Sequence, residues 1–436
     1  MTDLRSRPTA LPDHSVIPAV WTRYTDLVIE RGEGSWLFTT DGERYLDYTS
    51  GIGVINTGHA HPRVVRAVAE QASRLLHGQQ NIVYHEAGLR LHERLSRLMP
   101  GEGWGAFLSN SGAEAVEAAV KLARVATGRP IIIAFRGGFH GRTAQTMALT
   151  SSRVTVRGDF EPLPGSVYHV PYPYCYRAPD GPHPPEACSC DWEAQLQTLF
   201  AQMVDPRRVA AVIVEPVLGE GGYVVPPPDF LPRLRDITRQ HGMLLIADEI
   251  QTGYGRTGRM FAVEHWGVVP DIVVMAKGIA SGLPLSGILA PRQLLDRWPS
   301  GAHGGTYGGN VVCCAAAEAT LDVMADEGLV ANAAERGQQL LDGLRSLVDE
   351  TSAVGDVRGL GCMVALEFVR PDSGDRRTPD PGRAKEVLAE ALWRRLLLLS
   401  AGSWGQVVRI IPPLVTTSDE VVEAVRLIRE SVAATT

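Results

Sequence analysis

Four short and almost uninterrupted apolar runs constrain the fold of this chain more than any other feature. They are PIIIAF (130–135), AAVIVEP (210–216), MLLIADEI (243–250) and DIVVMA (271–276). A strand with one face in water alternates apolar and polar residues, whereas these runs indicate strands covered on both faces, as in a parallel sheet. Amphipathic stretches such as 113–128 separate the runs. The alternation predicts an α/β fold with a doubly wound, mostly parallel sheet.

The two ends of the 436-residue chain differ from its middle. Residues 35–48 resemble a hairpin with Asp41-Gly42 at its turn, and the residues after 325 mix long helices with separate strands. We expect residues 1–60 and 326–436 to form a smaller α+β domain beside a large domain of residues 61–325. Two exposed loops are expected at 172–190 and 370–383.

Composition and charge exclude several classes of function. The net charge is −7 and the chain has no dense run of Lys or Arg, so we expect no nucleic-acid partner. The longest apolar runs are far shorter than the ~20 residues of a membrane span, and we expect no membrane partner. The first residues, MTDLRSRPTALPDHS, have no apolar core of a secretion signal, which favours a cytoplasmic location.

Six cysteines in a chain of this length indicate reduced thiols rather than a disulfide framework. Cys313 and Cys314 fall in an apolar helical pattern and are expected in the core. Cys175, Cys188 and Cys190 fall in a proline-rich loop near two histidines, which raises zinc as an alternative. The spacing C-x12-C-x-C is not a standard zinc pattern, and no metal site is predicted.

Polar and flexible residues follow each predicted strand. Ligands bind outside the carboxyl ends of strands in open α/β sheets, so these residues describe a pocket. They are Ser111-Gly112-Ala113 after AFLSN, Phe139 to Arg142 after PIIIAF, Glu215 and GEGG after AVIV, Asp248 after MLLIA, and Lys277 after DIVVMA.

Each of these residues has a chemical use and a simpler alternative. The turn at Ser111 aims helix N–H groups at an anion such as a phosphate, although any helix cap looks similar. Asp248 needs a cationic partner, which is either a protonated pyridine nitrogen or a structural ion pair. Lys277 is either a nucleophile that bonds to an aldehyde or a surface lysine. Together with Phe139 as a ring-stacking residue, the set specifies pyridoxal 5′-phosphate (PLP).

Nine motifs in order resemble the class III aminotransferases, a family of fold-type I PLP-dependent transferases, and are most similar to its 4-aminobutyrate branch. The resemblance extends from about residue 28 to the last helix. The motifs are YLDYTSGIGVINTGHAHP, NSGAEAVEAAVKLAR, GGFHGRT, VEPVLGEGG, IADEIQTGYGRTG, MAKGIASGLPLSG, GGTYGGN, VGDVRGLG and RIIPPL.

The resemblance implies a role for each cofactor-binding residue. Lys277 bonds to the cofactor's aldehyde and Asp248 pairs with its ring nitrogen, so these two are the expected catalytic residues. Thr306 reaches the phosphate of a partner subunit, which implies a homodimer with a shared site. The remaining expected contacts are Ser111, Gly112 and Ala113 for the phosphate, Gln251 for the ring hydroxyl, and Phe139, His140 and Ile250 around the ring.

The resemblance also implies substrate contacts. Arg409 matches the arginine that grips an α-carboxylate, because its planar fork bonds a carboxylate at two points. Glu215 matches the acid that pairs with this arginine when an ω-amine lies there instead of the carboxylate, although a plain ion pair at the strand end is an alternative. Arg142 matches the residue that holds a distal carboxylate, and Ile52 matches a residue lining the pocket.

The expected activity is transfer of an amino group from an ω-amino acid, such as 4-aminobutyrate, to 2-oxoglutarate or pyruvate. Two departures from the family pattern leave the amine donor open: Phe139 stands where relatives have Tyr, and Trp404 lies near Arg409. Amino-acid racemisation on the same fold is the alternative activity. A non-catalytic binding module is the third hypothesis, and the joint presence of Lys277, Asp248 and Gln251 argues against it.

Overall fold

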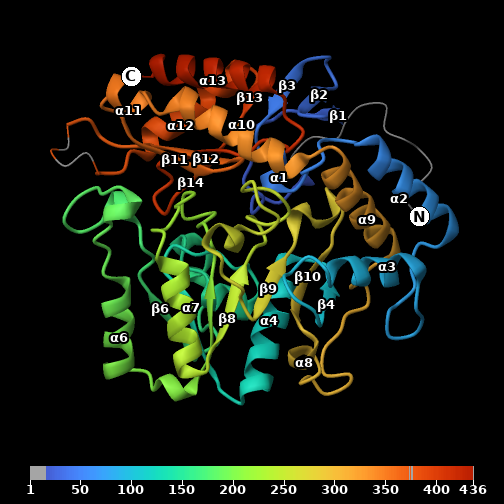
Figure 1. The fold of residues 1–436 in the computed structure, drawn as a ribbon. Helices are drawn as coiled ribbons and strands as arrows, with labels where there is room; N and C mark the ends of the chain where they lie inside the picture. Colours follow the sequence, from blue (N-terminus) through green and yellow to red (C-terminus); the bar gives the residue numbers. More distant parts are fainter. Residues whose placement is uncertain (1–15, 373, 375–376, 436) are drawn as a thin grey trace.

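A seven-stranded sheet lies at the centre of the larger, lower part of the molecule in the computed structural model, which describes residues 16–372, 374 and 377–435 (Figure 1). The strand order is β4-β10-β9-β8-β7-β5-β6. The strands are β4 (Trp104–Ser109), β5 (Ile131–Phe135), β6 (Val167–Val170), β7 (Val209–Val214), β8 (Leu244–Asp248), β9 (Ile272–Met275) and β10 (Ser286–Pro291). Only β10 is antiparallel to its neighbours, β4 and β9. The predicted doubly wound, mostly parallel sheet is confirmed.

Successive side chains of β5 enter two different cores, which explains its uninterrupted apolar sequence. Ile132 and Ala134 pack with α4, whereas Ile133 and Phe135 pack with α6 and α7 on the opposite face. Side chains of a strand alternate between faces, so a strand with helices on both sides carries no polar positions. The three helices are α4 (Gly112–Thr127), α6 (Trp192–Gln202) and α7 (Phe230–His241).

Helix α9 (Val311–Asp326) is apolar over most of its surface and packs against α2 (Pro62–Arg74) and α3 (Glu86–Leu95). Most of its side chains are buried, including those of Cys313 and Cys314, as predicted. In the described ranges, no helix combines the length and the apolar content that crossing a membrane requires.

Two four-stranded sheets lie in the upper part of the molecule in Figure 1. The first has the order β1-β2-β3-β13, and the parallel pairing of β3 with β13 joins the N-terminal segment to the C-terminal part. The second has the order β11-β12-β15-β14 and packs against α10 and α12, and α13 packs against these two helices. The elements are β1 (Ile29–Glu33), β2 (Trp36–Thr39), β3 (Arg44–Asp47), β11 (Val354–Leu360), β12 (Met363–Phe368), β13 (Leu396–Leu397), β14 (Leu399–Ala401), β15 (Val407–Ile410), α10 (Leu329–Leu344), α12 (Pro381–Trp393) and α13 (Ser418–Ala433).

The hairpin predicted at 35–48 is the antiparallel pair β2–β3, and Gly42 in its turn has φ +88°. The domain boundaries at 60/61 and 325/326 stay predictions. Residues 1–15 of the first predicted segment, residues 373 and 375–376 of the predicted second loop, and residue 436 lie outside the described part of the chain.

A left-handed turn follows β3 at α1 (Ser50–Gly53). All four residues have φ between 47° and 72°. Glycine adopts this conformation readily, whereas for the β-branched Ile52 it is strained. A side chain at position 53 would lie 2.6 Å from Ile411 Cδ1, so the turn packs directly against the C-terminal part.

The loop 172–190 corrects the expectation that all six cysteines are reduced. Cys175 and Cys188 form a disulfide with their Cα atoms 5.2 Å apart, and Cys190 is free. The loop folds back on itself through two short turns, η4 (Cys175–Arg177) and η5 (Pro185–Ala187). Cys175 and Cys188 are 13 residues apart in the sequence, and only the folded loop brings them together.

Candidate active site

Lys277 follows β9 directly and opens the short helix η8 (Lys277–Ala280) with φ +47°, a left-handed conformation that is uncommon for a residue with a side chain. The side chain is half-buried. Burial lowers the pKa of the Lys277 amine to about 8, although Glu220 acts in the opposite direction. A lowered pKa increases the neutral, nucleophilic fraction of the amine near neutral pH.

Asp248 is the last residue of β8 and is buried together with His140. Its Oδ2 lies 2.7 Å from His140 Nδ1, and its Oδ1 accepts a hydrogen bond of 3.2 Å from the N–H of Ile250. Burial by itself lowers the pKa of His140, but the hydrogen bond and the charge of Asp248 outweigh it and the pKa is raised. The pair holds the carboxylate in one orientation.

Lys277 and Asp248 line the same cavity, which has a volume of about 360 Å³. The sheet therefore brings the Lys277 amine and the Asp248 carboxylate into the same cavity, as predicted. Seven other predicted residues line this cavity, namely Gly112, Ala113, Phe139, His140, Glu215, Ile250 and Gln251. A larger cavity of about 540 Å³ lies elsewhere, against α3 and β4, and contains neither Lys277 nor Asp248.

The N-terminus of α4 forms one end of the cavity. The Ser111 side chain accepts a hydrogen bond of 3.3 Å from the N–H of Glu114, and the Glu114 carboxylate accepts from the N–H of Ser111. The N–H groups of Gly112 and Ala113 have no partner within the helix, as in the first turn of any helix. They offer a site for an anionic group, and a side chain at position 112 would meet Ile250 Cδ1 at 2.9 Å.

One buried polar atom indicates what the cavity is built to hold. Gln251 Oε1 is buried and has no hydrogen-bond partner within the described chain. A buried acceptor without a partner is costly, and a ligand hydroxyl in this cavity would satisfy it. With N–H groups for a phosphate, a carboxylate for a ring nitrogen and an amine for an aldehyde, the residues fit PLP.

The predicted ion pair between Arg409 and Glu215 is wrong, because Arg409 pairs with Glu220 instead. The Arg409 side chain is almost completely buried, whereas about a quarter of the Glu220 side chain is exposed. Burial raises the pKa of Glu220, but the charges of Arg409 and Lys277 outweigh it, so the pKa lies below its ordinary value. Glu220 is therefore an ionised counter-charge for a buried arginine.

Glu215 has a different set of partners. Its carboxylate accepts hydrogen bonds of 2.8 Å from the N–H groups of Phe139 and Gly219. Burial raises the pKa of Glu215 to about 7, although the His140 charge acts in the opposite direction. The carboxylate thereby fixes the backbone that carries Phe139.

Five predicted residues do not line this cavity in the single chain. Ser111 is used by the helix cap, and Arg142 is exposed with its guanidinium 5.3 Å from the centre of the Phe139 ring. Ile52 and Thr306 are exposed, and Arg409 lies behind Glu220. Trp404, expected beside Arg409, is also exposed and lies under the Arg177 guanidinium at 4.9 Å.

Sequence reasoning missed Glu220, Asn110 and Val54, which all line the cavity. Glu220 was visible as the single acid within GEGG, where flanking glycines let the backbone approach other groups closely. Asn110 and Val54 carried no such signal, because only the folded chain shows that they face the cavity.

Three relatives are similar to this chain over most of its length. The probable 4-aminobutyrate aminotransferase of Bacillus subtilis (strain 168) is 40% identical over 406 residues, or 93% of this chain and 92% of that protein. The 5-aminovalerate aminotransferase DavT of Pseudomonas putida is 39% identical over 389 residues, or 89% of each. The alanine/serine racemase of Pyrococcus horikoshii is 35% identical over 410 residues, or 93% of this chain and 85% of that protein.

A solved structure supports the fold and the cofactor. The amine transaminase from an uncultivated Pseudomonas species, in a PLP-bound form, has a TM-score of 0.89 and 34% identity, and the match covers 99% of this chain and 98% of that one. The family model described as "Aminotransferase class-III" matches residues 17–432. The chain therefore belongs to the class III aminotransferases and is an enzyme whose cofactor is pyridoxal 5′-phosphate.

Proposed function

We propose that this enzyme transfers the amino group of an ω-amino acid, 4-aminobutyrate or a close analogue, to 2-oxoglutarate or pyruvate. The observation that carries the proposal is the buried Arg409 with Glu220 as its counter-charge. An arginine that is neutralised by a neighbouring acid can accept an ω-amine beside it, and it can bind an α-carboxylate when the acid moves away. One site then serves both the amine donor and the keto acid.

Bound PLP supplies an aldehyde that bonds to amines and a cationic ring that accepts electrons. With PLP bound, Lys277 would act as the base and then the acid that moves the substrate's proton. Asp248 would hold the proton on the ring nitrogen, and His140 orients Asp248 through its contact at Oδ2. Glu215 fixes the backbone of Phe139, whose ring lies where it can cover one face of the cofactor.

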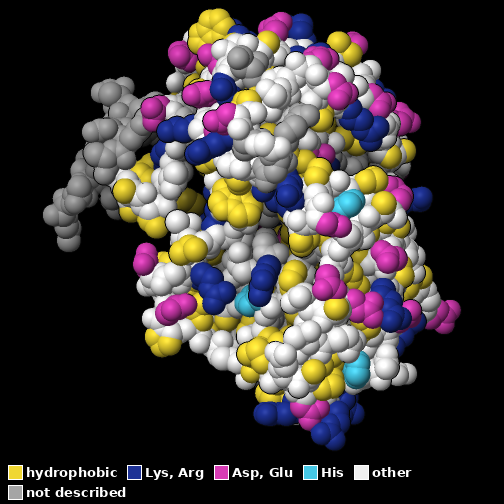
Figure 2. Space-filling view, turned by 90° about the vertical axis from the view of Figure 1, so that its left-hand side faces the viewer, with side chains coloured by type: hydrophobic (Ala, Val, Ile, Leu, Met, Phe, Trp, Pro, Cys, Tyr) yellow, Lys and Arg dark blue, Asp and Glu magenta, His cyan; other side chains and the backbone are white. Residues whose placement is uncertain are grey.

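Basic side chains favour substrates with carboxylates. Figure 2 shows Lys and Arg side chains beside the hollow between the upper and lower parts of the molecule. We assign the distal carboxylate of 4-aminobutyrate to Arg142 and the α-carboxylate of the keto acid to Arg409. Ile52 is assigned to the wall of the same pocket.

A panel of matched amines tests the substrate class. The panel is 4-aminobutyrate, 5-aminovalerate, ornithine and butylamine, each with 2-oxoglutarate and with pyruvate. Because a charge-assisted hydrogen bond contributes about 1.5–3 kcal/mol, kcat/KM for 4-aminobutyrate should exceed that for butylamine by about 10- to 100-fold. Arg142→Ala should remove this preference and leave butylamine turnover unchanged. Equal rates for the two amines in the unaltered enzyme would contradict the proposal.

The relative that is a racemase makes racemisation the second candidate. L-alanine and L-serine, incubated without any keto acid, distinguish the two activities. Under the proposal neither amino acid loses optical activity at a rate comparable with transamination.

Lys277→Ala should abolish multiple-turnover transamination, and measurable turnover by that variant would contradict the role of Lys277.

We further propose a cytoplasmic homodimer in which Thr306 completes the partner's phosphate site. Large apolar side chains are exposed in the single chain at Leu76, Ile82, Tyr84 and Tyr307, and an exposed apolar patch favours association. Light scattering during size exclusion should give twice the 47.1 kDa chain mass. A monomer that is fully active would refute the shared site.

A further inference from the structure

The three cysteines of the loop 172–190 form a cluster whose chemistry the amino-transfer reaction does not use. The sulfur atoms of Cys175, Cys188 and Cys190 all lie within 4.8 Å of one another. Cys175 is buried and the other two are half-buried. Three sulfur ligands at this separation are close to the arrangement around zinc, where Zn–S bonds of about 2.3 Å in a tetrahedron place sulfurs about 3.8 Å apart.

The backbone of the loop holds the cluster in place. The N–H of His183 donates to Cys175 O at 3.1 Å, and the N–H of Ala187 donates to Pro184 O at 3.0 Å. The first bond joins the returning chain to η4, and the second forms the turn that precedes Cys188. The cluster is therefore assembled by the fold and does not depend on the disulfide alone.

The disulfide Cys175–Cys188 and a metal ion exclude each other, because a disulfide sulfur has no thiolate to donate. A phosphine cleaves the disulfide to two thiols and takes up the oxygen of one water molecule. A cation then displaces up to three thiol protons as it binds.

We propose that the reduced loop 172–190 binds one soft divalent cation, with zinc as the probe, through Cys175, Cys188 and Cys190. A small-molecule disulfide, which takes up the two electrons and is itself reduced to two thiols, converts Cys175 and Cys188 to their disulfide and thereby expels the cation. Tetrahedral zinc has four ligands, so three thiolates leave one position for water. In a reducing compartment disulfides are rare, and clustered cysteines there more often bind metals.

The site is attached to the substrate pocket through a chain of contacts. Arg177, in the turn that begins with Cys175, donates to Glu367 at 2.7 Å and lies over Trp404. Gln406 connects the same carboxylate, at 3.2 Å, to the N–H of Trp404. A cation that closes the loop would hold this connection between the loop and the strand that carries Arg409.

Zinc stoichiometry tests the site directly on the full-length, PLP-loaded enzyme. One sample is reduced with a phosphine and the other is left oxidised; both are incubated with zinc, gel-filtered and analysed by elemental mass spectrometry. The reduced enzyme should retain about one zinc ion per chain and the oxidised enzyme much less than that. Retention below about half an ion per chain after reduction would overturn the proposal.

Two variants separate the site from adventitious binding. Cys190→Ser should lose the zinc, whereas Cys313→Ala, which removes a buried thiol of α9, should retain it. Cobalt in place of zinc should give the visible absorption of thiolate-bound tetrahedral cobalt in the unaltered enzyme and in Cys313→Ala only. Full zinc retention by a folded Cys190→Ser protein contradicts the proposal. The amino-transfer proposal is tested separately, because these measurements do not depend on turnover.

Discussion

At the scale of single residues, the protonation of Lys277 controls its bond to the cofactor. Only the neutral amine attacks an aldehyde, and burial places the pKa at about 8. The rate of PLP uptake by the cofactor-free enzyme should therefore rise with pH, with its midpoint at about 8. Stopped-flow absorbance measures this rate. A midpoint near the ordinary lysine value of about 10.4 would contradict the assigned environment.

The charge of Glu220 should affect the pH midpoint of PLP uptake. Its negative charge raises the pKa of Lys277, and the positive charge of Arg409 lowers it. Glu220→Gln removes the first effect and leaves Arg409 without its counter-charge, so the midpoint of PLP uptake should move to lower pH. An unchanged midpoint would show that Glu220 does not act on the amine. Lys277→Ala serves as the baseline, because it has no amine to bond.

The site was predictable where a residue's position in the chain fixes its position in space. Lys277 and Asp248 each end a buried strand, and parallel strands bring such ends to one edge. Glu215 and Glu220 lie five positions apart in one glycine-rich segment, and sequence alone does not show which of them turns toward Arg409. The choice depends on backbone hydrogen bonds to Phe139 and Gly219 that form only in the folded chain.

At the scale of elements, two helices offer a matched comparison. Both α4 and α13 begin with a reciprocal cap, at Ser111 with Glu114 and at Thr417 with Glu420. Ser111→Ala and Thr417→Ala should each lower the free energy of unfolding by about 1 kcal/mol. Only Ser111→Ala should also speed the loss of PLP, because only α4 begins at the cavity. Chemical denaturation measures the free energy of unfolding, and the rate of PLP dissociation measures cofactor loss. Equal rates of PLP loss from Ser111→Ala and Thr417→Ala would contradict the assignment of the cofactor's phosphate to the N-terminus of α4.

Strands covered on both faces were predictable from their uninterrupted apolar sequences, as β5, β7, β8 and β9 show. The direction of β10 was not, since its sequence SGILAP does not encode whether it runs with or against its neighbours. That direction follows from its connection to η8 and from its position between β4 and β9.

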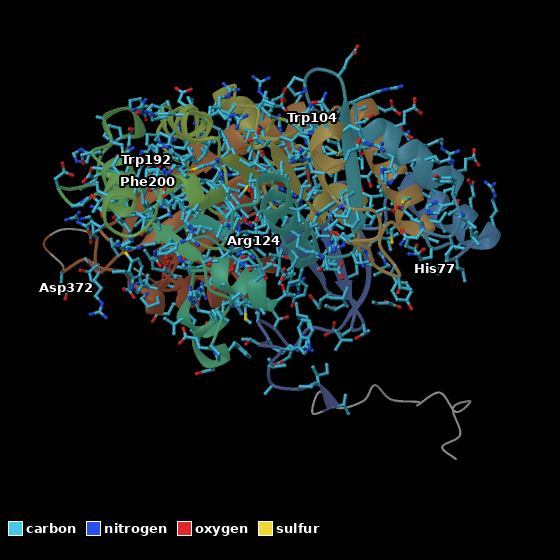
Figure 3. All side chains as sticks on the ribbon, turned by 90° about the horizontal axis from the view of Figure 1, so that it is seen from below. His77, Trp104, Arg124, Trp192, Phe200 and Asp372 are labelled. Carbon is cyan, nitrogen blue, oxygen red and sulfur yellow. A yellow bond between two sulfur atoms is a disulfide. The ribbon has the colours of Figure 1, made fainter. Side chains whose placement is uncertain are left out.

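At the scale of the whole molecule, Glu367 joins the loop 172–190 to the C-terminal sheet. Its buried carboxylate accepts from Arg177 at 2.7 Å and lies 2.6 Å from Arg358 Nη1. Figure 3 shows Trp192 and Phe200, from the helix after this loop, at one end of the molecule and His77 at the other. The Glu367 contacts therefore tie that end of the lower part to the upper part.

Removing this carboxylate should be strongly destabilising. Glu367→Gln leaves the largely buried Arg177 guanidinium without its counter-charge and leaves Arg358 with Asp356 alone, which costs about 3–5 kcal/mol. Thermal unfolding measures the loss, and Glu423→Gln, which breaks an exposed ion pair of α13, is the control with an expected loss below about 1 kcal/mol. Equal losses would contradict the role of Glu367.

The Glu367 carboxylate also makes the stability of the protein depend on pH. Burial raises the pKa of Glu367, but the charges of Arg358 and Arg177 outweigh it, so the folded pKa lies below the ordinary value. Its contribution to stability is complete above the ordinary pKa and disappears as pH falls through the lowered one. The gap in stability between the unaltered protein and Glu367→Gln should therefore narrow in acid. A gap that widens in acid would contradict this sign.

The left-handed turn at Ser50–Gly53 limits how Ile52, the residue proposed for the pocket wall, can be redesigned. Glycine at 51 and 53 meets the geometry at no steric cost, whereas position 52 already carries a strained β-branched side chain. Combinatorial libraries should therefore diversify position 52, including asparagine and glycine, and keep both neighbours fixed. Glycine or asparagine at position 52 would relieve backbone strain there rather than add to it.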